Sequence, residues 1–301
     1  MIWIVGRKGM LGRIVEQELE TANEPFVACG SECDVTNEES IRSCAPRMAP
    51  DWVINCTGYT AVDRAEREPR AAWAVNRTAA GHLARYCRSV EAAMVHISTD
   101  YVFDGSRKRG YDETATTAPL NVYGASKEAG ERLLRSLVDA HVIIRSAWLY
   151  AETGRNFLLN VLHKLHDETE LTIVNDQHGT PTYARDLARA IIAVVTSPKI
   201  EYGTFHFVNA GTTTWYEFAC EIQEMALHRG LTSMRRTIHP VTSNRYVTLA
   251  TRPLHSVLRF ERIERAYDIA PRPWREALRD CMARIPVTRS AEPPYLDVVN
   301  R

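Results

Sequence analysis

Tyr123 and Lys127 stand four residues apart, a spacing that places both side chains on one face of a helix. A nearby ammonium favours a phenolate, so we expect Lys127 to lower the pKa of Tyr123 below its usual value of ~10. That would make Tyr123 a proton donor and acceptor near neutrality. Thr99 follows the apolar run 94–97 and would orient the same substrate oxygen. Alone, the pair is a weak signal, because both residues are common on solvated helix faces.

A glycine-rich loop near the N-terminus gives the pair its context. The apolar run 1–5 is typical of a buried parallel strand, and Gly6, Gly9 and Gly12 follow it before a helical pattern at 13–19. Glycines here permit a tight turn, let backbone amides approach a pyrophosphate, and let the helix pack close to the strand. A turn that binds nothing is the alternative, but its place directly after a strand favours a nucleotide at the helix N-terminus.

Strands alternate with helices along the first half of the chain, which predicts an α/β fold with a Rossmann-type, doubly wound parallel sheet. The expected strands are 1–5, 26–29, 52–56, 94–98 and 141–150, and the expected helices include a short one capped by Thr36 or Asn37, then 71–89 and 119–137. Ligands of such sheets bind beyond the carboxyl ends of the strands. The glycine loop and segments 58–60, 98–100 and 146–148 should meet at that edge.

The second half is less regular, with expected helices at 156–165, 185–195 and 217–229 and strands at 171–174 and 204–208. We expect residues 1–150 to form the NAD(P)-binding domain, which about 184–210 rejoins. Residues 151–183 and 211–285 should form a smaller substrate-binding lobe, and 286–301 a loosely attached tail.

The composition fits a cytoplasmic enzyme. The 301 residues are 45% hydrophobic and 25% charged, with a formal net charge of +0, so nothing favours nucleic acid or an anionic membrane. No run of about 18 apolar residues predicts a membrane span, and no signal-type segment opens the sequence. Seven cysteines form no CxxC pair and no zinc-type spacing, which favours reduced thiols and no bound metal.

Nearly the whole chain resembles the dTDP-4-dehydrorhamnose reductase family, within the extended short-chain dehydrogenase/reductases. The resemblance rests on Asn55–Asp63 with Ala65 and Glu66, Ser98–Gly105, Pro119–Gly124, Arg145–Trp148, Asp176–Thr182, Gly211–Trp215, and Arg252, Pro253 and Ser256. The segment STDYVF is the most specific, because related sugar-nucleotide dehydratases usually carry an acid where Tyr101 stands. Its absence favours simple reduction.

The resemblance implies that Tyr123 protonates the C4 oxygen of dTDP-4-dehydro-6-deoxy-L-mannose during hydride transfer, giving dTDP-L-rhamnose. Lys127 would hold the nicotinamide ribose and Thr99 would orient the carbonyl. The remaining implied cofactor contacts are Gly6, Gly9, Met10, Leu11 and Gly12 at the pyrophosphate, Asp34 and Val35 at the adenine, and Gly58, Tyr59 and Thr60 farther along. The implied sugar contacts are Asp100, Tyr101 and Trp148, the last being equally typical of a core residue.

Cofactor preference and substrate are less sharply specified. The second strand ends at 29–31 without the acid that would hold a ribose 2′-hydroxyl, and Arg7 and Lys8 lie in the glycine loop, so NADPH is favoured and NADH stays open. Two other functions remain open: reduction of another nucleotide-linked 4-keto-6-deoxy sugar, and a non-catalytic NADP-binding regulatory subunit. A homodimer is also left open.

Overall fold

The computed structural model describes residues 1–287, so the tail expected at 286–301 lies almost wholly outside the described residues. Six parallel strands form the central sheet in the order β10-β5-β4-β3-β1-β2. Their bounds are β1 Ile2–Val5, β2 Phe26–Cys29, β3 Trp52–Asn55, β4 Ala93–Thr99, β5 His141–Ser146 and β10 Gly203–His206. The strand order reverses between β1 and β3, and the glycine loop leaves β1 at this switch point, where doubly wound sheets bind ligands.

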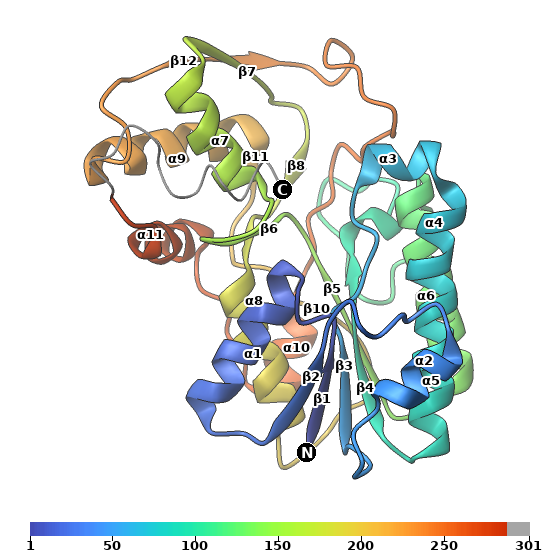
Figure 1. The fold of residues 1–301 in the computed structure, drawn as a ribbon. Coiled ribbons are helices and arrows are strands. Elements are labelled where there is room, and N and C mark those ends of the chain that lie inside the picture. Colours follow the sequence, from blue (N-terminus) through green and yellow to red (C-terminus); the bar gives the residue numbers. More distant parts are fainter. Residues whose placement is uncertain (288–301) are drawn as a thin grey trace.

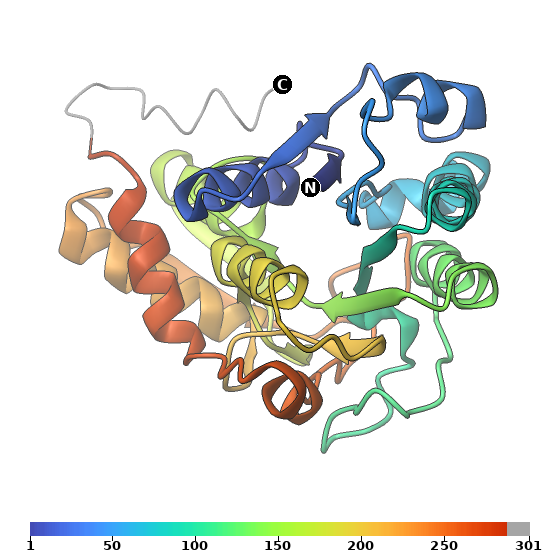
Figure 2. The same cartoon turned by 90° about the horizontal axis from the view of Figure 1, so that it is seen from below.

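Helices cover both faces of the sheet (Figures 1 and 2). One face packs against α1 (Met10–Ala22), α8 (Ala184–Val195) and α10 (Glu261–Tyr267), and the other against α2 (Glu38–Cys44), α5 (Ala79–Ser89) and α6 (Val122–Leu137). β1, β3 and β4 are buried along their whole length, because a parallel sheet covered on both faces needs apolar residues at every position. The sheet is therefore a rigid base for the loops at its carboxyl edge.

The smaller lobe has its own hydrophobic core and stands beyond the carboxyl edge of the sheet (Figure 1). Its helices are α7 (Phe157–Asp167), α9 (Trp215–Arg229) and α11 (Trp274–Arg284), and its strands are β6 (Leu149–Tyr150), β7 (Glu170–Val174), β8 (His178–Gly179), β9 (Thr182–Tyr183), β11 (Thr213–Thr214) and β12 (Thr237–Val241). β12 runs parallel to β7 and was not expected from the sequence.

Three expected boundaries are wrong for local reasons. The strand expected over 141–150 ends at Ser146, because Trp148 has φ +47° and turns the chain so that β6 pairs with β9 in the other lobe. The helix expected over 71–89 is instead α4 (Pro69–Trp73), a π-helical turn (Ala74–Thr78) and α5. The helix expected from 119 begins at Val122, since the Asn121 side chain accepts the Gly124 N–H and caps it.

Candidate active site

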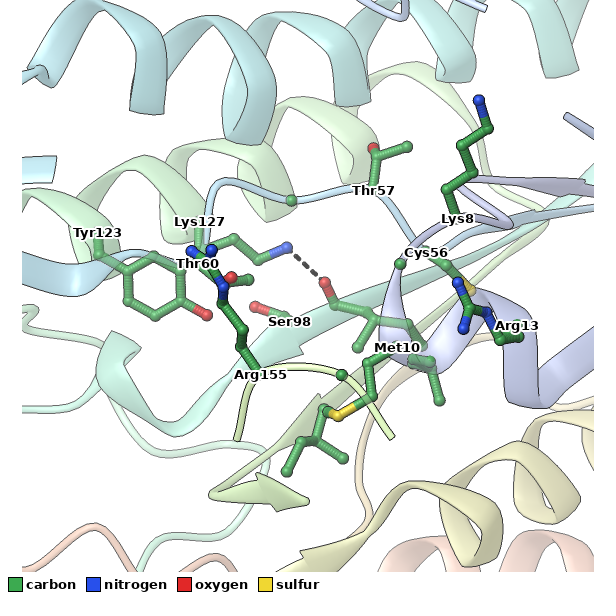
Figure 3. Close-up of a pocket in the computed structure, with 16 residues that line it drawn as sticks. Lys8, Met10, Arg13, Cys56, Thr57, Thr60, Ser98, Tyr123, Lys127 and Arg155 are labelled. Carbon is green, nitrogen blue, oxygen red and sulfur yellow. Dashed lines mark hydrogen bonds between the residues drawn. The ribbon is translucent and has the colours of Figure 1, made fainter. Parts of the chain in front are cut away.

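A cavity of about 850 Å³ lies over the carboxyl ends of β1, β3 and β4. Its lining joins the glycine loop, the segment after β3, the end of β4, the start of α6 and a loop of the smaller lobe. The lining residues are Lys8, Gly9, Met10, Leu11, Arg13, Cys56, Thr57, Gly58, Thr60, Ile97, Ser98, Tyr123, Lys127, Leu149, Gly154 and Arg155. Figure 3 shows Lys8 and Arg13 at one end of this space and Tyr123 and Arg155 at the other, with Lys127 between them.

The glycine loop brings the N-terminus of α1 to the cavity. A Cβ on Gly12 would lie only 2.8 Å from the Gly6 carbonyl carbon, so the helix packs this closely because no side chain intervenes. The N-cap residue, Gly9, has no side chain to satisfy the first-turn N–H groups, and no acid stands in that turn. Open N–H donors and a positive dipole end suit the pyrophosphate of a dinucleotide.

The two basic residues of the glycine loop, Arg7 and Lys8, differ in their partners and in whether they line the cavity. Arg7 is held by Glu16 through two side-chain hydrogen bonds. Lys8 lines the cavity, and its Nζ donates to Ser31 Oγ at 2.7 Å. An acid is also present just past 29–31: the Glu32 carboxylate accepts the Gly30 N–H at 2.6 Å and lies 3.9 Å from Lys8 Nζ. The sequence reading missed this acid because it stands beyond the strand end.

Tyr123 and Lys127 lie on the same face of α6, beside the end of β4. The Lys127 ammonium donates to the carbonyl of Ile97 at 2.5 Å (Figure 3). The Tyr123 hydroxyl is hydrogen-bonded to Thr99, whose own hydroxyl also contacts the Asp100 carboxyl at 3.1 Å. The three residues predicted to carry the chemistry are thus brought together by one helix and one strand end.

The expected effect of Lys127 on Tyr123 is wrong in this structure. Burial raises the pKa of Tyr123 to about 12, and the hydrogen bond between Tyr123 and Thr99 opposes this only in part. Burial also lowers the pKa of Lys127 to about 8, although the Glu131 carboxylate favours the charged form. Desolvation is therefore the largest influence on both pKa values. Tyr123 is a neutral phenol at neutral pH, which is the form that donates a proton.

Close packing fixes where Tyr123 sits. A Cβ on the next residue, Gly124, would lie 2.9 Å from the Tyr101 carbonyl carbon and closer still to its oxygen. The start of α6 therefore rests directly on the backbone that follows β4. The Tyr101 ring meets the Tyr123 ring edge-on, with centroids 5.8 Å apart. The segment STDYVF and the Tyr–Lys helix form a single packed unit.

Asn76, in the π-helical turn, holds the segment after β3. Its side-chain oxygen accepts the Tyr59 N–H at 2.8 Å, and its amide donates to the Tyr59 carbonyl at 3.1 Å and to Ser126 Oγ at 2.9 Å. Gly58 and Thr60 line the cavity as a result, while the Tyr59 hydroxyl turns away and donates to Glu68. No motif in the sequence singled out Asn76.

Several predicted residues lie outside the cavity lining. Gly6 and Gly12 pack against each other in the glycine loop. Val35 is buried in the core, and Asp34 accepts hydrogen bonds from the backbone N–H and the hydroxyl of Thr36. Trp148 stacks on Trp215, with ring centroids 3.6 Å apart. Other residues line the cavity although the sequence did not single them out as contacts, and these are Arg13, Cys56, Thr57, Ile97, Leu149, Gly154 and Arg155.

A second hollow lies toward the smaller lobe, where two cavities, of about 230 and about 410 Å³, share Gln177, Tyr246, Thr248 and Arg252 in their linings. Arg252 bonds to Asp63 on α3 (Val62–Arg67) and to the Tyr101 side chain. The neighbouring residue in the chain, Asp100, is buried, and desolvation raises the pKa of its carboxyl group to about 7. These contacts connect the Tyr–Lys centre to the smaller lobe.

Residues 1–287 contain no group of three or more His, Cys, Asp or Glu side chains placed to hold a metal ion. Within the same residues, no helix has both the length and the apolar character needed to cross a membrane.

Comparison with known proteins gives one consistent result. The family model described as RmlD substrate binding domain matches residues 1–287. A dTDP-4-dehydrorhamnose reductase of Streptomyces griseus is 39% identical, covering 92% of each chain. A dTDP-4-keto-6-deoxy-D-glucose reductase of Streptomyces niveus is 37% identical, covering 92% of this chain and 94% of its own. The crystal structure of a dTDP-4-dehydrorhamnose reductase from Bacillus anthracis in complex with NADP matches with a TM-score of 0.87 and 33% identity, over 94% of this chain and 98% of that one.

Proposed function

Since the chain belongs to the dTDP-4-dehydrorhamnose reductase family, an oxidoreductase family, we propose that it reduces the C4 keto group of dTDP-4-dehydro-6-deoxy-L-mannose to dTDP-L-rhamnose. The observation that carries this proposal is the meeting of Tyr123, Lys127 and Thr99 beside a cavity that begins at the glycine loop: Tyr123 and Lys127 line the cavity, and Thr99 contacts Tyr123 at the end of β4. NADPH is the proposed reductant, supported by the NADP complex of the Bacillus anthracis relative.

In the proposed reaction NADPH supplies the hydride that adds to C4. Tyr123 gives its phenolic proton to the C4 oxygen as negative charge develops there. Its raised pKa, about 12, keeps the phenol protonated until that moment. Thr99, already hydrogen-bonded to Tyr123, orients the same oxygen, and the Lys127 ammonium binds the nicotinamide ribose.

The proposed cofactor contacts follow the cavity from end to end. Gly9, Met10 and Leu11 line the end proposed for the pyrophosphate; the Gly9 N–H already donates to the Gly6 carbonyl, so the first-turn N–H groups that follow it are the donors that suit the anion. Gly58 and Thr60 line the middle. We place the adenine beyond Lys8, toward Asp34 and Val35, outside the lining described above. Gly6, Gly12 and Tyr59 act by shaping the loops rather than by side-chain contact.

We propose that the sugar binds between the Tyr–Lys centre and the smaller lobe, with Asp100, Tyr101 and Trp148 as its contacts. In this division residues 1–150 and about 184–210 hold the cofactor, and 151–183 and 211–285 the substrate. The two cavities whose linings share Gln177 and Arg252 support a site for the nucleotide diphosphate next to the smaller lobe. Tyr101, standing in place of an acid, supports reduction rather than elimination. The seven free cysteines support a cytoplasmic protein.

The similarity to the Streptomyces niveus protein favours one alternative, reduction of the 4-keto group of another dTDP-linked 6-deoxy sugar. A non-catalytic regulatory subunit is the other alternative, and the intact Tyr–Lys–Thr set speaks against it. Loss of NADPH absorbance with dTDP-4-keto-6-deoxy-L-mannose and with dTDP-4-keto-6-deoxy-D-glucose distinguishes the three. Turnover of the first substrate supports the proposal, turnover of the second alone supports the alternative sugar, and tight NADPH binding without turnover supports the regulatory subunit.

Tyr123→Phe tests the assignment of the proton donor. We expect turnover to fall by about 10²–10⁴-fold, the usual contribution of a general acid, while the Kd for NADPH stays close to that of the wild type. A fully active variant would show that another group protonates the C4 oxygen.

A further inference from the structure

Glu131 is a fully buried carboxylate one helical turn beyond Lys127 on α6. Arg145, on β5, donates to it through Nε at 2.9 Å and Nη2 at 2.7 Å. Arg135 adds a bond at 3.1 Å, and the Ser98 hydroxyl donates to the other carboxylate oxygen. Burying charges costs free energy even when they are paired, so a set of apolar residues in place of both Glu131 and its arginine partners would serve stability equally well.

We propose that Glu131 is a positioning residue of the reductase centre: its carboxylate fixes the end of β4 through Ser98 and holds Lys127 in its charged form. This proposal rests on the proposed function only in that it assigns Lys127 to the cofactor ribose.

The geometry for positioning is a set of paired contacts between one helix and one strand. α6 presents Tyr123, Lys127 and Glu131 at four-residue intervals, on a single face. Tyr123 contacts Thr99, Lys127 contacts the Ile97 carbonyl, and Glu131 contacts Ser98. Three consecutive residues of β4 therefore each meet one of three successive turns of α6. Removing the Glu131 contact takes away the partner on α6 of the Ser98 side chain, which stands next to Thr99.

The charges around Lys127 give Glu131 a second role. The titratable groups that face the ammonium are Glu131 on α6, Cys56 after β3 and His96 on β4. Burial raises the pKa of the Cys56 thiol to about 12 and lowers that of His96 well below its usual value, so both are neutral near pH 7. Glu131 stays ionised, because Arg145, Ser98 and Arg135 hold its pKa at about 2 against desolvation. Of the groups facing Lys127 in the described residues, Glu131 therefore supplies the negative charge.

The sign of the expected pH effect follows. If Lys127 must be charged, activity and NADPH binding fall as pH rises through its pKa, which is about 8. Glu131→Gln keeps the size of the side chain and removes its charge, so this pKa should fall further. We expect the basic limb of kcat against pH, and of the Kd for NADPH against pH, to move down by about one pH unit or more, the effect of one nearby opposite charge.

Glu18→Gln is the matched control. Glu18 is also a buried carboxylate paired with two arginines, Arg185 and Arg189, but it lies on α1 away from Tyr123 and Lys127. Both variants should lower the melting temperature, and only Glu131→Gln should move the basic limb. Glu131→Asp retains the charge, so its basic limb should lie at the wild-type pH. Its kcat should nevertheless stay low, because the shorter side chain no longer reaches Ser98.

A Glu131→Gln protein that is folded at 25 °C and has the wild-type limb in both kcat and Kd would overturn the proposal. Should that variant fail to fold, Ser98→Ala tests the anchoring alone: we expect kcat to fall about tenfold with the limb unmoved, and an unchanged kcat would overturn the proposal. The Kd profile also separates this inference from the proposed function, because it can be measured even if the wild type reduces neither keto sugar.

Discussion

Gly124→Ala should displace the proton donor without removing any functional group. The added Cβ would lie 2.9 Å from the Tyr101 carbonyl carbon and closer still to the oxygen, and both are backbone atoms that cannot rotate away. Ordinary carbon contacts are ~3.5–4.0 Å, so the start of α6 and the backbone after β4 must separate by roughly 1 Å. Tyr123 moves with the helix while Thr99 stays with the strand. A misplacement of ~1 Å costs about 10²-fold in rate, and overpacking costs about 1–3 kcal/mol of stability.

The assay is kcat for reduction of the keto sugar, with the free energy of unfolding measured in parallel by urea. Gly81→Ala is the matched control, because Gly81 also lies on a helix, α5, but faces the flexible end of the Leu133 side chain. The control should keep kcat within about twofold, since a leucine end can turn aside without moving backbone. A Gly124→Ala protein with wild-type kcat would refute the reasoning, because the contact at Gly124 would then not set the position of Tyr123.

Two further predictions concern cofactor choice and acid stability. Lys8→Ala should raise the Kd for NADPH about tenfold in a fluorescence titration and leave the Kd for NADH almost unchanged, because Lys8 lines the cavity. Arg7→Ala is the control, since Arg7 is bonded to Glu16 and does not line the cavity; an equal loss for both cofactors in Lys8→Ala would contradict the assignment. The pKa of His206 is lowered to about 3 by burial and by Arg145, so below pH ~6.5 the unfolded chain takes up a proton that the folded chain refuses. His206 should therefore contribute a loss of about 2 kcal/mol between pH 7 and pH 5 in urea unfolding, so the pH slope of stability should be smaller in His206→Asn than in the wild type; equal pH slopes would contradict this.

The sequence predicted the fold well where periodic burial decides it. β1, β3 and β4 are apolar at nearly every position, and only a sheet covered on both faces explains such runs. It failed where one residue redirects the chain. Nothing in the order Ser-Ala-Trp indicates that Trp148 takes a positive φ, since that conformation depends on its stacking against Trp215, 67 residues away in sequence.

The candidate site was predictable to the extent that its residues follow strand ends. Gly58 and Thr60 were found because they come after β3, and the same rule, applied two residues earlier, would have included Cys56 and Thr57. Asn76 and Arg155 could not be found in this way. Each reaches the site from an element that is remote in sequence, and long-range packing leaves no local pattern.

The electrostatics of Tyr123 show why proximity in a sequence does not determine a pKa. The four-residue spacing predicts an ammonium that stabilises a phenolate, but both groups leave water when α6 packs on β4, and each is then pushed toward its neutral form. The pKa values of about 12 and about 8 leave Lys127, rather than Tyr123, to titrate near physiological pH. A reductase gains from this arrangement, because its acid must keep its proton until hydride arrives. We therefore expect the basic limb of the pH profile to be set by the ammonium and by Glu131, the carboxylate that opposes its desolvation.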